Sequence, residues 1–496
     1  MNDEGVTVVW QGKYDKFYIG GEWVDPASNA TFDVISPASE EVIATVPQGV
    51  AADMDRAVGA ARAAFDSGPW PRMSLEERSA IMRRFSELLG ERQSDVAELV
   101  TAEMGCPITL SNGMQAIGTK LVLDAFIDNA PLVNWQSTRE ALNGKALVTK
   151  VPIGVVGAIV PWNAPLLTSM LKLAPSLLAG CSFILKPAPN TPLSAYLMTE
   201  LLEQAGVPDG VVNVVAADRD AGEHLVRHPG VDKISFTGST AAGRRIGEIC
   251  AQDFKRLTLE LGGKSAAVVL DDADLDVVLP AIRAVSFRNT GQVCSNKTRI
   301  VVAKSRRDEL CDRLVSLVES MPLGDPFDPA TELGPLVSAT QRARVEGYIE
   351  AGKSEDAKLL IGGGRPAAQG KGFYVEPTLF ANVDPNAKIA QEEIFGPVLA
   401  IMTAADDDEA IAIANNSKYG LNGSVFSVDE DRALGVARRI LTGTVEVNGA
   451  GSGFSAPVGG FKQSGLGREC GIEGFDAYTE IKSYGISEDM YDKLSG

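Results

Sequence analysis

Short apolar segments alternate with longer amphipathic ones between residues 151 and 260. The short segments have the length of strands, and the longer ones repeat their apolar residues at helical spacing. Gly180 and Gly206 follow two of the predicted helices, where glycine commonly ends a helix. The predicted strands cover residues 155–160, 182–185, 211–215, 233–237 and 256–259, and the predicted helices cover 166–178, 193–204, 221–227 and 241–251. Strict alternation of this kind predicts an α/β fold with a doubly wound parallel sheet.

A second alternation follows residue 260 and predicts a second α/β region. Its strands are expected at residues 265–270, 298–302, 424–426 and 443–448, and its helices at 306–320, 339–352, 407–415 and from 275 to beyond 287. Nearer the N-terminus, short strands are expected at 17–24, 32–35 and 42–46, and helices at 53–65, 74–89, 96–103 and 116–129. Ser74 heads a capping box at the start of one of these helices. Residues 449–467 are rich in Gly and Ser and are predicted to form a long loop.

The length and charge of the chain exclude several classes of protein. A chain of 496 residues exceeds the size of a single hydrophobic core, so more than one domain is expected. The 46 Lys and Arg residues stand against 65 Asp and Glu, and the net charge of −19 opposes binding to nucleic acid or to an anionic membrane surface. The sequence contains no run of about 18 apolar residues, so no membrane span is predicted. We therefore expect neither nucleic acid nor a membrane as a partner.

The cysteines and histidines indicate a reducing compartment and no metal site. The six cysteines are spaced neither as a disulfide framework nor as a zinc site. His224 and His228 share a helical spacing, but no Glu follows the first of them, and Pro229 ends the helix. Residues 1–5 are acidic and begin no apolar signal segment. These features predict a cytoplasmic protein.

One cysteine is a candidate nucleophile because of its position between regular elements. Cys294, in Gly291-Gln292-Val293-Cys294, lies on a turn between a predicted helix and a predicted strand. Glu260 ends a predicted strand just before a pair of glycines, and with only two histidines a carboxylate is the available general base. A lone cysteine is more often a small buried apolar residue, so this pair alone does not identify a site.

Other polar residues follow the ends of the predicted parallel strands. Asn163 follows residues 155–160, and its amide is suited to stabilising an oxyanion, although it is also suited to capping a helix. Lys186 follows residues 182–185 and is suited to a hydroxyl or phosphate, unless it is simply solvated. Gly238 and Ser239 stand where a strand meets a helix, as in phosphate sites. The segment matches neither a G-x-G-x-x-G fingerprint nor a P-loop.

Six motifs, taken together and in this order, resemble the aldehyde dehydrogenase superfamily, and the resemblance extends from residue 17 to about 481. They are Pro161-Trp162-Asn163, Lys186-Pro187-Ala188, Phe236-Thr237-Gly238-Ser239-Thr240, Glu260-Leu261-Gly262-Gly263-Lys264, Gly291-Gln292-Val293-Cys294 and Glu392-Glu393-Ile394-Phe395-Gly396-Pro397. The resemblance implies oxidation of an aldehyde to a carboxylic acid with NAD(P)+, through a thiohemiacetal and a thioester on a cysteine.

The resemblance also implies three structural parts. A doubly wound, discontinuous cofactor-binding domain would cover residues 1–128 and 152–261, and an α/β catalytic domain 262–463. A small β bridging and oligomerisation element would cover 129–151 and 464–496, joining a homodimer or homotetramer. Residues 147–149 and 478–482 are expected to be edge strands that pair between subunits.

The resemblance assigns the catalytic roles. Cys294 would attack the aldehyde carbon, and Asn163 with the Cys294 backbone N–H would hold the oxyanion. Glu260 would then activate the water that hydrolyses the thioester. Glu469, in Gly467-Arg468-Glu469, matches a second carboxylate assigned to proton relay with Lys172.

The resemblance likewise implies how the cofactor is held. Lys186 and Glu393 would bind ribose hydroxyls, Ser239 would contact the pyrophosphate, and Phe395 would lie near the nicotinamide ribose. The remaining residues of the expected cofactor site are Trp162, Gly238 and Pro189. Pro189 stands where many NAD-preferring relatives carry Glu, which removes a carboxylate that would repel a 2′-phosphate but adds no cation to attract one. NAD is therefore the expected cofactor, and NADP is expected to be accepted measurably.

Side chains expected along the substrate path predict an apolar aldehyde. Many relatives line this path with aromatic residues, whereas the matching residues here are Ala164, Leu171 and Val458. These three residues and Val293 offer no fixed cation. We expect an aliphatic, terpenoid or aromatic aldehyde rather than an anionic semialdehyde, since a buried carboxylate without a partner is costly. Lys297, close to Cys294 in sequence, is the residue most able to contradict this expectation.

Two alternative functions remain open at this stage. A CoA-acylating relative would pass the acyl group to a thiol, but such relatives commonly lack the carboxylate at the Glu260 position. A binding or structural relative would keep the fold without the chemistry, and the presence of both Cys294 and Glu260 opposes that alternative.

Overall fold

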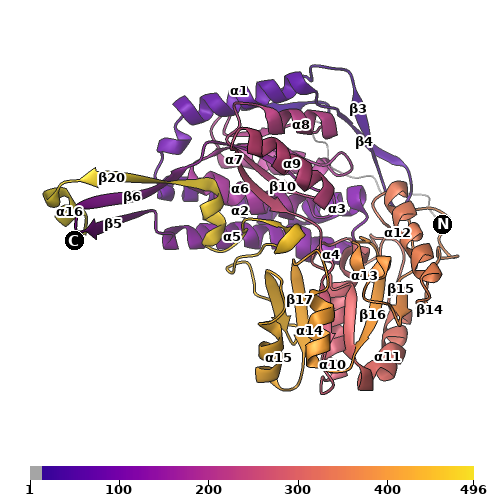
Figure 1. Ribbon diagram of the computed structural model, residues 1–496. Helices are drawn as coiled ribbons and strands as arrows, with labels where there is room; N and C mark the ends of the chain where they lie inside the picture. Colours follow the sequence, from indigo (N-terminus) through magenta and orange to yellow (C-terminus); the bar gives the residue numbers. More distant parts are fainter. Residues whose placement is uncertain (1–13, 496) are drawn as a thin grey trace.

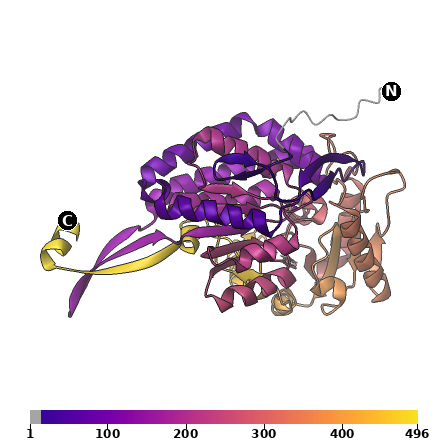
Figure 2. The ribbon, with the colours of Figure 1, turned by 90° about the horizontal axis from the view of Figure 1, so that it is seen from above.

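Two mixed sheets and a projecting arm dominate residues 14–495, the part of the chain that the computed structural model describes (Figure 1). The sheets contain eight and seven strands, and the arm contains three. Seen from above, the arm extends away from both sheets (Figure 2). The acidic segment 1–5 lies outside the described residues. No helix within residues 14–495 is long and apolar enough to cross a bilayer.

The eight-stranded sheet contains the parallel strands expected from the first alternation. They are β7 Val155–Ile159, β8 Ser182–Lys186, β9 Val212–Val214, β10 Lys233–Thr237 and β11 Arg256–Glu260. The connecting helices are α6 Pro165–Ala179, α7 Leu193–Ala205, α8 Arg219–Arg227 and α9 Thr240–Gln252. The strand order is β19-β11-β10-β7-β8-β9-β1-β2. The predicted α/β class with a doubly wound parallel sheet is therefore confirmed.

The topology of this sheet brings the candidate residues to one edge. The chain builds outward from β7 through β8 and β9, then returns to add β10 and β11 on the other side of β7. Such a switch point opens a crevice at the carboxyl ends of the strands. Asn163 follows β7, Lys186 ends β8, Ser239 follows β10 and Glu260 ends β11. Parallel pairing therefore gathers residues that are far apart in the sequence.

The seven-stranded sheet forms the second α/β region. Its order is β14-β15-β16-β13-β12-β17-β18, and every pair except β14 with β15 is parallel. The strands are β12 Ala266–Val269, β13 Arg299–Ala303, β14 Lys358–Ile361, β15 Thr378–Ala381, β16 Val398–Ala404, β17 Asn422–Phe426 and β18 Thr444–Val447. The helices are α10 Leu275–Ser286, α11 Arg307–Glu319, α12 Ala339–Ser354, α13 Lys388–Gln391, α14 Asp407–Asn415 and α15 Glu430–Ala437. Sequence reasoning missed β14, β15, β16, α13 and α15, because short apolar runs carry no periodicity that separates strand from helix.

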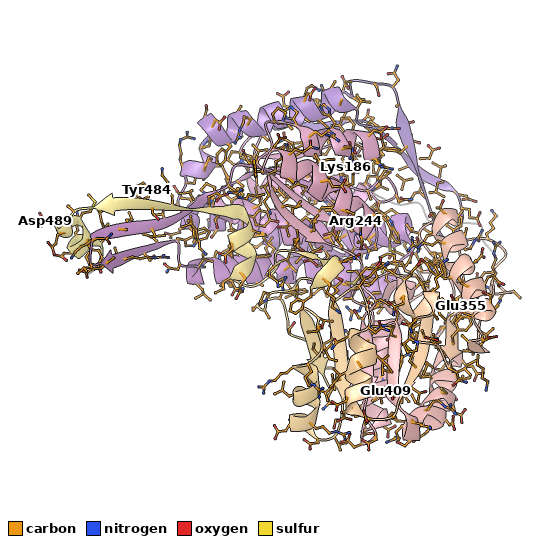
Figure 3. The ribbon with its side chains drawn as sticks, in the orientation of Figure 1. Lys186, Arg244, Glu355, Glu409, Tyr484 and Asp489 are labelled. Carbon is orange, nitrogen blue, oxygen red and sulfur yellow. The ribbon has the colours of Figure 1, made fainter. Side chains whose placement is uncertain are left out.

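The arm corrects one expectation about strand edges. It consists of β5 Gln136–Ala141, β6 Gly144–Pro152 and β20 Thr479–Ile486, followed by α16 Glu488–Ser495. Residues 147–149 were expected at an edge, but they lie in β6, which pairs with β20 on one side and β5 on the other. The free edges of the arm are thus β5 and β20. Tyr484 and Asp489 mark its far end in Figure 3, away from Lys186 and Arg244 of the first sheet region and Glu355 and Glu409 of the second.

The N-terminal part follows the predicted pattern closely. Its strands are β1 Phe17–Ile19, β2 Glu22–Val24, β3 Thr31–Ile35 and β4 Val42–Pro47, and its helices are α1 Ala51–Ser67, α2 Leu75–Glu91, α3 Gln93–Met104, α4 Ile108–Leu110 and α5 Gly118–Asn129. Ser74 caps α2 by accepting from Glu77 N at 3.2 Å, while Glu77 Oε2 accepts from Ser74 N at 2.7 Å. A π-helical turn, Ser111–Ile117, precedes α5, and such turns often occur near functional sites.

The glycine-rich segment 449–467, predicted to be a long loop, also contains short regular elements. It contains a 3-10 turn, Lys462–Ser464, and the strand β19 Gly465–Leu466. β19 pairs with β11, placing Gly465 opposite Glu260. A Cβ at Gly465 would lie 2.0 Å from the Leu259 carbonyl oxygen, and its φ of 148° also favours glycine. The glycine permits this close approach, so the segment covers the end of β11.

Candidate active site

A strained turn presents the thiol of Cys294. After α10, the turn Arg288–Gly291 contains three consecutive left-handed residues: Asn289 (φ 53°), Thr290 (φ 55°) and Gly291 (φ 79°). A Cβ at Gly291 would lie 2.0 Å from the Gly396 carbonyl oxygen, so the close approach of the Gly396 backbone requires glycine at this position. Backbone strain of this kind concentrates at functional sites. Cys294 is partly exposed, whereas each of the other five cysteines is buried.

Asn163 is tied to the segment that carries the thiol. Its Nδ2 donates to Gln292 O at 2.8 Å. The backbone carbonyl oxygen of Asn163 accepts from Gln115 Nε2 at 3.2 Å and from Asn289 Nδ2 at 3.0 Å. An amide nitrogen carries two protons, so one Nδ2 proton remains for a further acceptor. Asn163 and Cys294 also line the same cavity, of about 190 Å³.

Glu260 ends β11 in a buried environment. Its Oε1 is buried and has no hydrogen-bond partner among residues 14–495. Burial, and secondarily the negative charge of Glu469, raise the pKa of Glu260 to about 8, whereas Lys172 and Arg468 act in the opposite direction. The carboxyl group is therefore able to take and release a proton near neutral pH, which suits a general base.

This raised pKa leads to a prediction about deacylation. A general base must be ionised, and the ionised fraction of Glu260 grows as the pH rises toward about 8. With saturating NAD+ and aldehyde, the steady-state rate should increase by roughly tenfold per pH unit well below the pKa and level off above it. Stopped-flow rates from pH 6 to 9 measure this step. A flat profile for the wild type, or an identical step in Glu260→Gln, would contradict the assignment.

The structure brings Lys172 and Glu469 together from distant parts of the chain. Lys172 Nζ lies 2.6 Å from Glu469 Oε1, and both side chains are almost fully buried. Glu469 is held by two backbone hydrogen bonds of 2.8 Å with Val458. A buried ion pair is costly to desolvate, so its place beside Glu260 points to a functional use.

The surroundings of the sulfur also control its reactivity. Although Cys294 as a residue is partly exposed, desolvation of its thiol raises the pKa of Cys294 to about 12, and the charges of Glu393 and Glu260 act in the same direction, against backbone N–H groups of the turn. The resting thiol is therefore protonated. A thiolate is the reactive form, so a base must remove this proton before attack.

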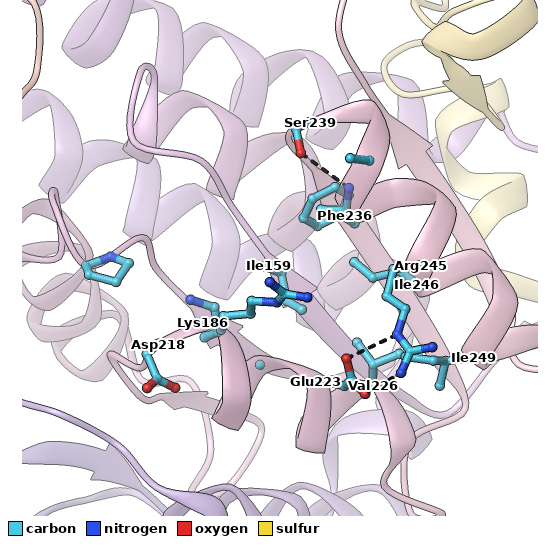
Figure 4. A pocket seen from close by; sticks show the side chains of 15 residues that line it. Ile159, Lys186, Asp218, Glu223, Val226, Phe236, Ser239, Arg245, Ile246 and Ile249 are labelled. Carbon is cyan, nitrogen blue, oxygen red and sulfur yellow. Dashed lines mark hydrogen bonds and ion pairs between the residues drawn. The ribbon is translucent and has the colours of Figure 1, made fainter. Parts of the chain in front are cut away.

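Two adjoining cavities follow the switch point of the first sheet. The larger, about 590 Å³, includes Lys186, Pro189, Asp218 and Arg219 in its wall (Figure 4). The smaller one, of about 190 Å³, reaches Cys294 and also includes Trp162, Gly238, Glu393 and Phe395. Ser239 lines both cavities. Together they form a path that suits an extended dinucleotide ending at the thiol.

Polar groups along this path fit the parts of a dinucleotide. Lys186 Nζ donates to Ala217 O at 2.7 Å, and burial lowers the pKa of Lys186 to about 8. Ser239 caps α9 by accepting from Ala242 N at 3.3 Å, so the positive end of the helix faces the path. At the other end, Glu393 Oε1 accepts from Gly263 N at 2.9 Å.

The walls of the path are fixed by aromatic side chains and glycine. The rings of Trp162 and Phe395 meet edge to face with centroids 5.3 Å apart. A Cβ at Gly238 would lie 2.5 Å from Cζ of Phe236, so this position stays small. These contacts leave room for a ligand backbone beside the α9 N-terminus.

The structure places two arginines near Pro189 that the sequence reasoning did not consider. Arg219 and Arg245 line the same cavity as Pro189. Arg245 pairs with Glu223 at 2.9 Å, as Figure 4 shows, whereas Arg219 makes no ion pair with the described residues. Sequence reasoning missed Arg219 because it lies at the start of α8, beyond β9, and only the fold places it beside Pro189.

The candidate substrate residues are aliphatic, but two cations, Arg288 and Lys297, lie close to Cys294 in the sequence. Ala164 is buried at the start of α6, and Leu171 and Val293 are half-buried. Lys297 Nζ lies 2.6 Å from Glu446 Oε1 in a largely buried pair, so its charge is neutralised. The expectation of no fixed cation overlooked Arg288, a half-buried side chain that interacts electrostatically with Glu446 and Cys294. Burial lowers the pKa of Arg288.

A thiol at the end of a dinucleotide-sized path, with an amide and a buried carboxylate, is typical of a nicotinamide-dependent oxidoreductase with a cysteine nucleophile. The aldehyde dehydrogenase family model matches residues 23–484. Geranial dehydrogenase of Castellaniella defragrans is 44% identical over 471 residues, which cover 95% of this chain and 98% of that relative.

Two solved structures are also similar over nearly their whole length. A Mycobacterium tuberculosis aldehyde dehydrogenase complexed with NAD+ has 45% identity and a TM-score of 0.94, covering 96% of this chain and 98% of that one. A mutant aldehyde dehydrogenase C of Pseudomonas syringae, complexed with NAD+ and octanal, has 40% identity and a TM-score of 0.93, covering 95% and 96%. The chain belongs to the aldehyde dehydrogenase family, and it is an NAD(P)-dependent enzyme that oxidises an aldehyde to the acid.

Proposed function

We propose that Cys294, Asn163 and Glu260 carry out this oxidation through a thiohemiacetal and a thioester. The observation that carries the proposal is the Asn163 amide, hydrogen-bonded at 2.8 Å to Gln292, two residues before the thiol. Its second Nδ2 proton and the Cys294 backbone N–H are donors for an oxyanion on a carbon bonded to Sγ. The Cys294 sulfur would form that bond after losing its proton to a base.

Glu260 supplies the base in both halves of the reaction. Its charge influences Cys294, so the two groups are electrostatically coupled, and it would take the thiol proton first. NAD+, when held on the path that ends at Cys294, would supply the acceptor for the hydride that leaves the substrate carbon. Glu260, freed of the first proton, would then take one from water as the water oxygen attacks the thioester carbon and the C–S bond breaks. The leaving Cys294 thiolate would take the proton of the carboxylic acid product, which departs as the carboxylate. Glu469 and Lys172 would relay protons away from Glu260.

The path from Pro189 to Cys294 is the proposed cofactor site. Lys186 and Glu393 would bind ribose hydroxyls, and the α9 N-terminus at Gly238 and Ser239 would bind the pyrophosphate. Trp162 and Phe395 would form the walls nearest the thiol. The half-buried, singly hydrogen-bonded carboxylate of Glu393 supports this role, because it retains acceptor capacity toward the path.

Arg219 should determine how well NADP is used. We expect Arg219→Ala to lower kcat/KM for NADP relative to NAD by about tenfold, equivalent to about 1.4 kcal/mol. The reason is that Arg219 lines the Pro189 cavity without an ion-pair partner among residues 14–495, whereas the other cations of its wall are the Glu223-paired Arg245 and the buried Lys186, which donates to Ala217 O. Arg245→Ala is the matched control, since Glu223 already neutralises that side chain. Dissociation constants for both cofactors, from protein fluorescence, provide a readout independent of turnover. Equal effects of the two variants would contradict the role of Arg219.

An apolar aldehyde is the proposed substrate. Aliphatic Ala164, Leu171 and Val293 and the neutralised Lys297 support this proposal. The names of two relatives, a geranial dehydrogenase and a mutant enzyme complexed with octanal, support it as well. Arg288 is the group that would favour an anionic substrate instead.

A substrate panel tests this proposal. We expect octanal, hexanal and geranial to exceed succinate semialdehyde in kcat/KM by at least about tenfold, because a carboxylate would have to be buried beside aliphatic side chains. NADH formation with and without added CoA, with identification of the acid product, also separates hydrolysis from acyl transfer. A higher kcat/KM for succinate semialdehyde would reverse the assignment and identify Arg288 as a substrate-binding residue.

We also propose the division into parts, the assembly and the location. Residues 1–128 and 152–261 would bind the cofactor, 262–463 would supply the catalytic thiol, and 129–151 with 464–496 would bridge subunits of a homodimer or homotetramer. The projecting arm supports this division, because its edge strands β5 and β20 are free to pair with another subunit. Six free cysteines support a cytoplasmic location.

A further inference from the structure

One face of β10 and β11 is polar, although strands in a doubly wound sheet are usually apolar on both faces. The register pairs Lys233 with Arg256, Ser235 with Thr258, and Thr237 with Glu260. Side chains alternate between the faces of a strand, so these six lie on one face. The intervening residues are apolar: Ile234, Phe236, Leu257 and Leu259. We call the six residues the polar strip. It runs from exposed Arg256 to the catalytic carboxylate Glu260.

Hydrogen bonds connect the middle of the polar strip. Lys233 Nζ donates to Thr258 Oγ1 at 2.6 Å and lies 5.0 Å from the centre of the Tyr478 ring. The hydroxyl groups of Ser235 and Tyr478 are 3.2 Å apart. Lys233 is 1% exposed, and no carboxylate within residues 14–495 forms an ion pair with it. A buried ammonium without a counter-charge is costly, so the neutral amine is favoured there.

Several titratable groups packed around Lys233 influence its pKa. Burial, then the charge of Lys172 on α6, lower the pKa of Lys233 to about 7. Glu469, Cys181 and Cys250 act in the opposite direction. Lys172 and Glu469 also influence the pKa of Glu260, so this ion pair is coupled electrostatically to both Lys233 and Glu260. An amine that titrates near neutral pH is able to accept a proton and to release it again.

A separate cavity gives Lys233 and Thr258 access to water. It measures about 500 Å³, and its wall includes Lys233, Thr258, Gly467, Arg468 and the exposed residue Arg256. Gly467 closes over the strip, since a Cβ there would lie 3.2 Å from Cγ2 of Thr258. A Cβ at Gly459 would lie 3.0 Å from Glu260 Oε1. The glycine-rich segment therefore covers the strip between the cavity and Glu260.

The proposed reaction loads Glu260 with two protons in each turnover, one from the thiol and one from water. Each of these protons must leave Glu260 before it acts again. We propose that the polar strip is a proton exit, in which protons pass from Glu260, by way of Lys172–Glu469, to the Lys233 amine and then along Thr258 to cavity water. Lys233 Nζ uses its lone pair to take the proton and loses it to water, so nothing is oxidised or reduced. This inference rests on the proposed role of Glu260.

Rapid-mixing kinetics on Thr258→Val and Lys233→Met test the exit. Val keeps the shape of Thr and removes its hydroxyl, and Met keeps much of the length of Lys without a titratable group. We expect an unchanged first-turnover burst of NADH and a steady rate lowered by about tenfold. This loss is smaller than the rate factor that a general base usually contributes. The solvent deuterium isotope effect on the steady rate should increase, because proton exit becomes limiting.

Matched controls separate this result from a packing effect. Thr199→Val removes another buried hydroxyl, which bonds to Ala195 O at 2.7 Å on α7, and should leave both phases unchanged. If Lys233→Met does not fold, Thr258→Val decides the test. Unchanged steady rates and isotope effects in the strip variants would overturn the exit. So would an equal loss of burst and steady rate, since that indicates damaged packing.

The test also distinguishes failure of the exit from failure of the proposed function. Mass spectrometry after mixing with octanal and NAD+ should detect acylated Cys294, and Glu260→Gln should prolong its lifetime. If Glu260→Gln has this effect and the strip variants do not slow turnover, only the exit is wrong. If Glu260→Gln leaves the lifetime unchanged, the assigned base is wrong and the exit loses its purpose.

Discussion

Cys294→Ala should abolish hydride transfer, lowering kcat by at least about 10⁵-fold, which is typical of loss of a catalytic nucleophile. Cys294 is partly exposed on the strained turn, whereas each of the other five cysteines is buried. Without its sulfur, no tetrahedral adduct forms beside the Asn163 amide, and the substrate carbon has no alkoxide to drive hydride departure. NADH absorbance with saturating octanal and NAD+ measures the loss.

The control for this variant is Cys311→Ala on α11, which removes a buried thiol remote from the proposed site. It should retain the wild-type rate, and Cys294→Ala should still bind NAD+ with little change in dissociation constant. Residual turnover by Cys294→Ala above about 1% of wild type would show that another group forms the adduct. The thiohemiacetal route would then have to be abandoned.

Glu260→Gln should separate acylation from deacylation. Gln keeps the size of Glu but cannot take a proton from water, so the thioester accumulates. The variant should release up to about one equivalent of NADH per active site in a burst that is slower than the wild-type burst, because water must then take the thiol proton in place of Glu260. Its steady rate should fall by roughly 10²–10⁴, since deacylation has lost its base. Stopped-flow absorbance resolves the two phases.

Glu469→Gln is the matched carboxamide variant for this experiment. Glu469 raises the pKa of Glu260 by its negative charge, so its removal should shift the pH profile of deacylation to lower pH rather than eliminate it. It also leaves Lys172 without its partner at 2.6 Å. If Glu260→Gln keeps the wild-type steady rate while Glu469→Gln loses it, Glu469 is the base.

Much of the fold was predictable because local patterns determine it. The spacing of apolar residues between 151 and 260 indicated strands and helices that the structure confirms, with Gly180 and Gly206 left-handed at the ends of α6 and α7. The capping box at Ser74 was confirmed in the same way. Such signals survive because backbone hydrogen bonding and side-chain periodicity act over a few residues.

The candidate site was predictable only as a set of separate strand ends. Parallel strands carry their carboxyl ends to one edge, so Asn163, Lys186, Ser239 and Glu260 were expected to meet there. The sequence could not give the hydrogen bond from Asn163 to Gln292 or the neutralisation of Lys297 by Glu446. Such contacts depend on how the two sheet regions pack, which no local pattern specifies.

The sequence by itself therefore determined the fold class, the family resemblance and the residue types available for chemistry. Only the tertiary structure neutralised Lys297 with Glu446, placed Arg219 beside Pro189, and put β6 in the centre of the arm. It also laid β19 against β11, over the end of the polar strip. The physical reason is that these arrangements are contacts between segments distant along the chain. Their free energy comes from burial and pairing in the folded state, whereas sequence periodicity reports only the conformation of each segment.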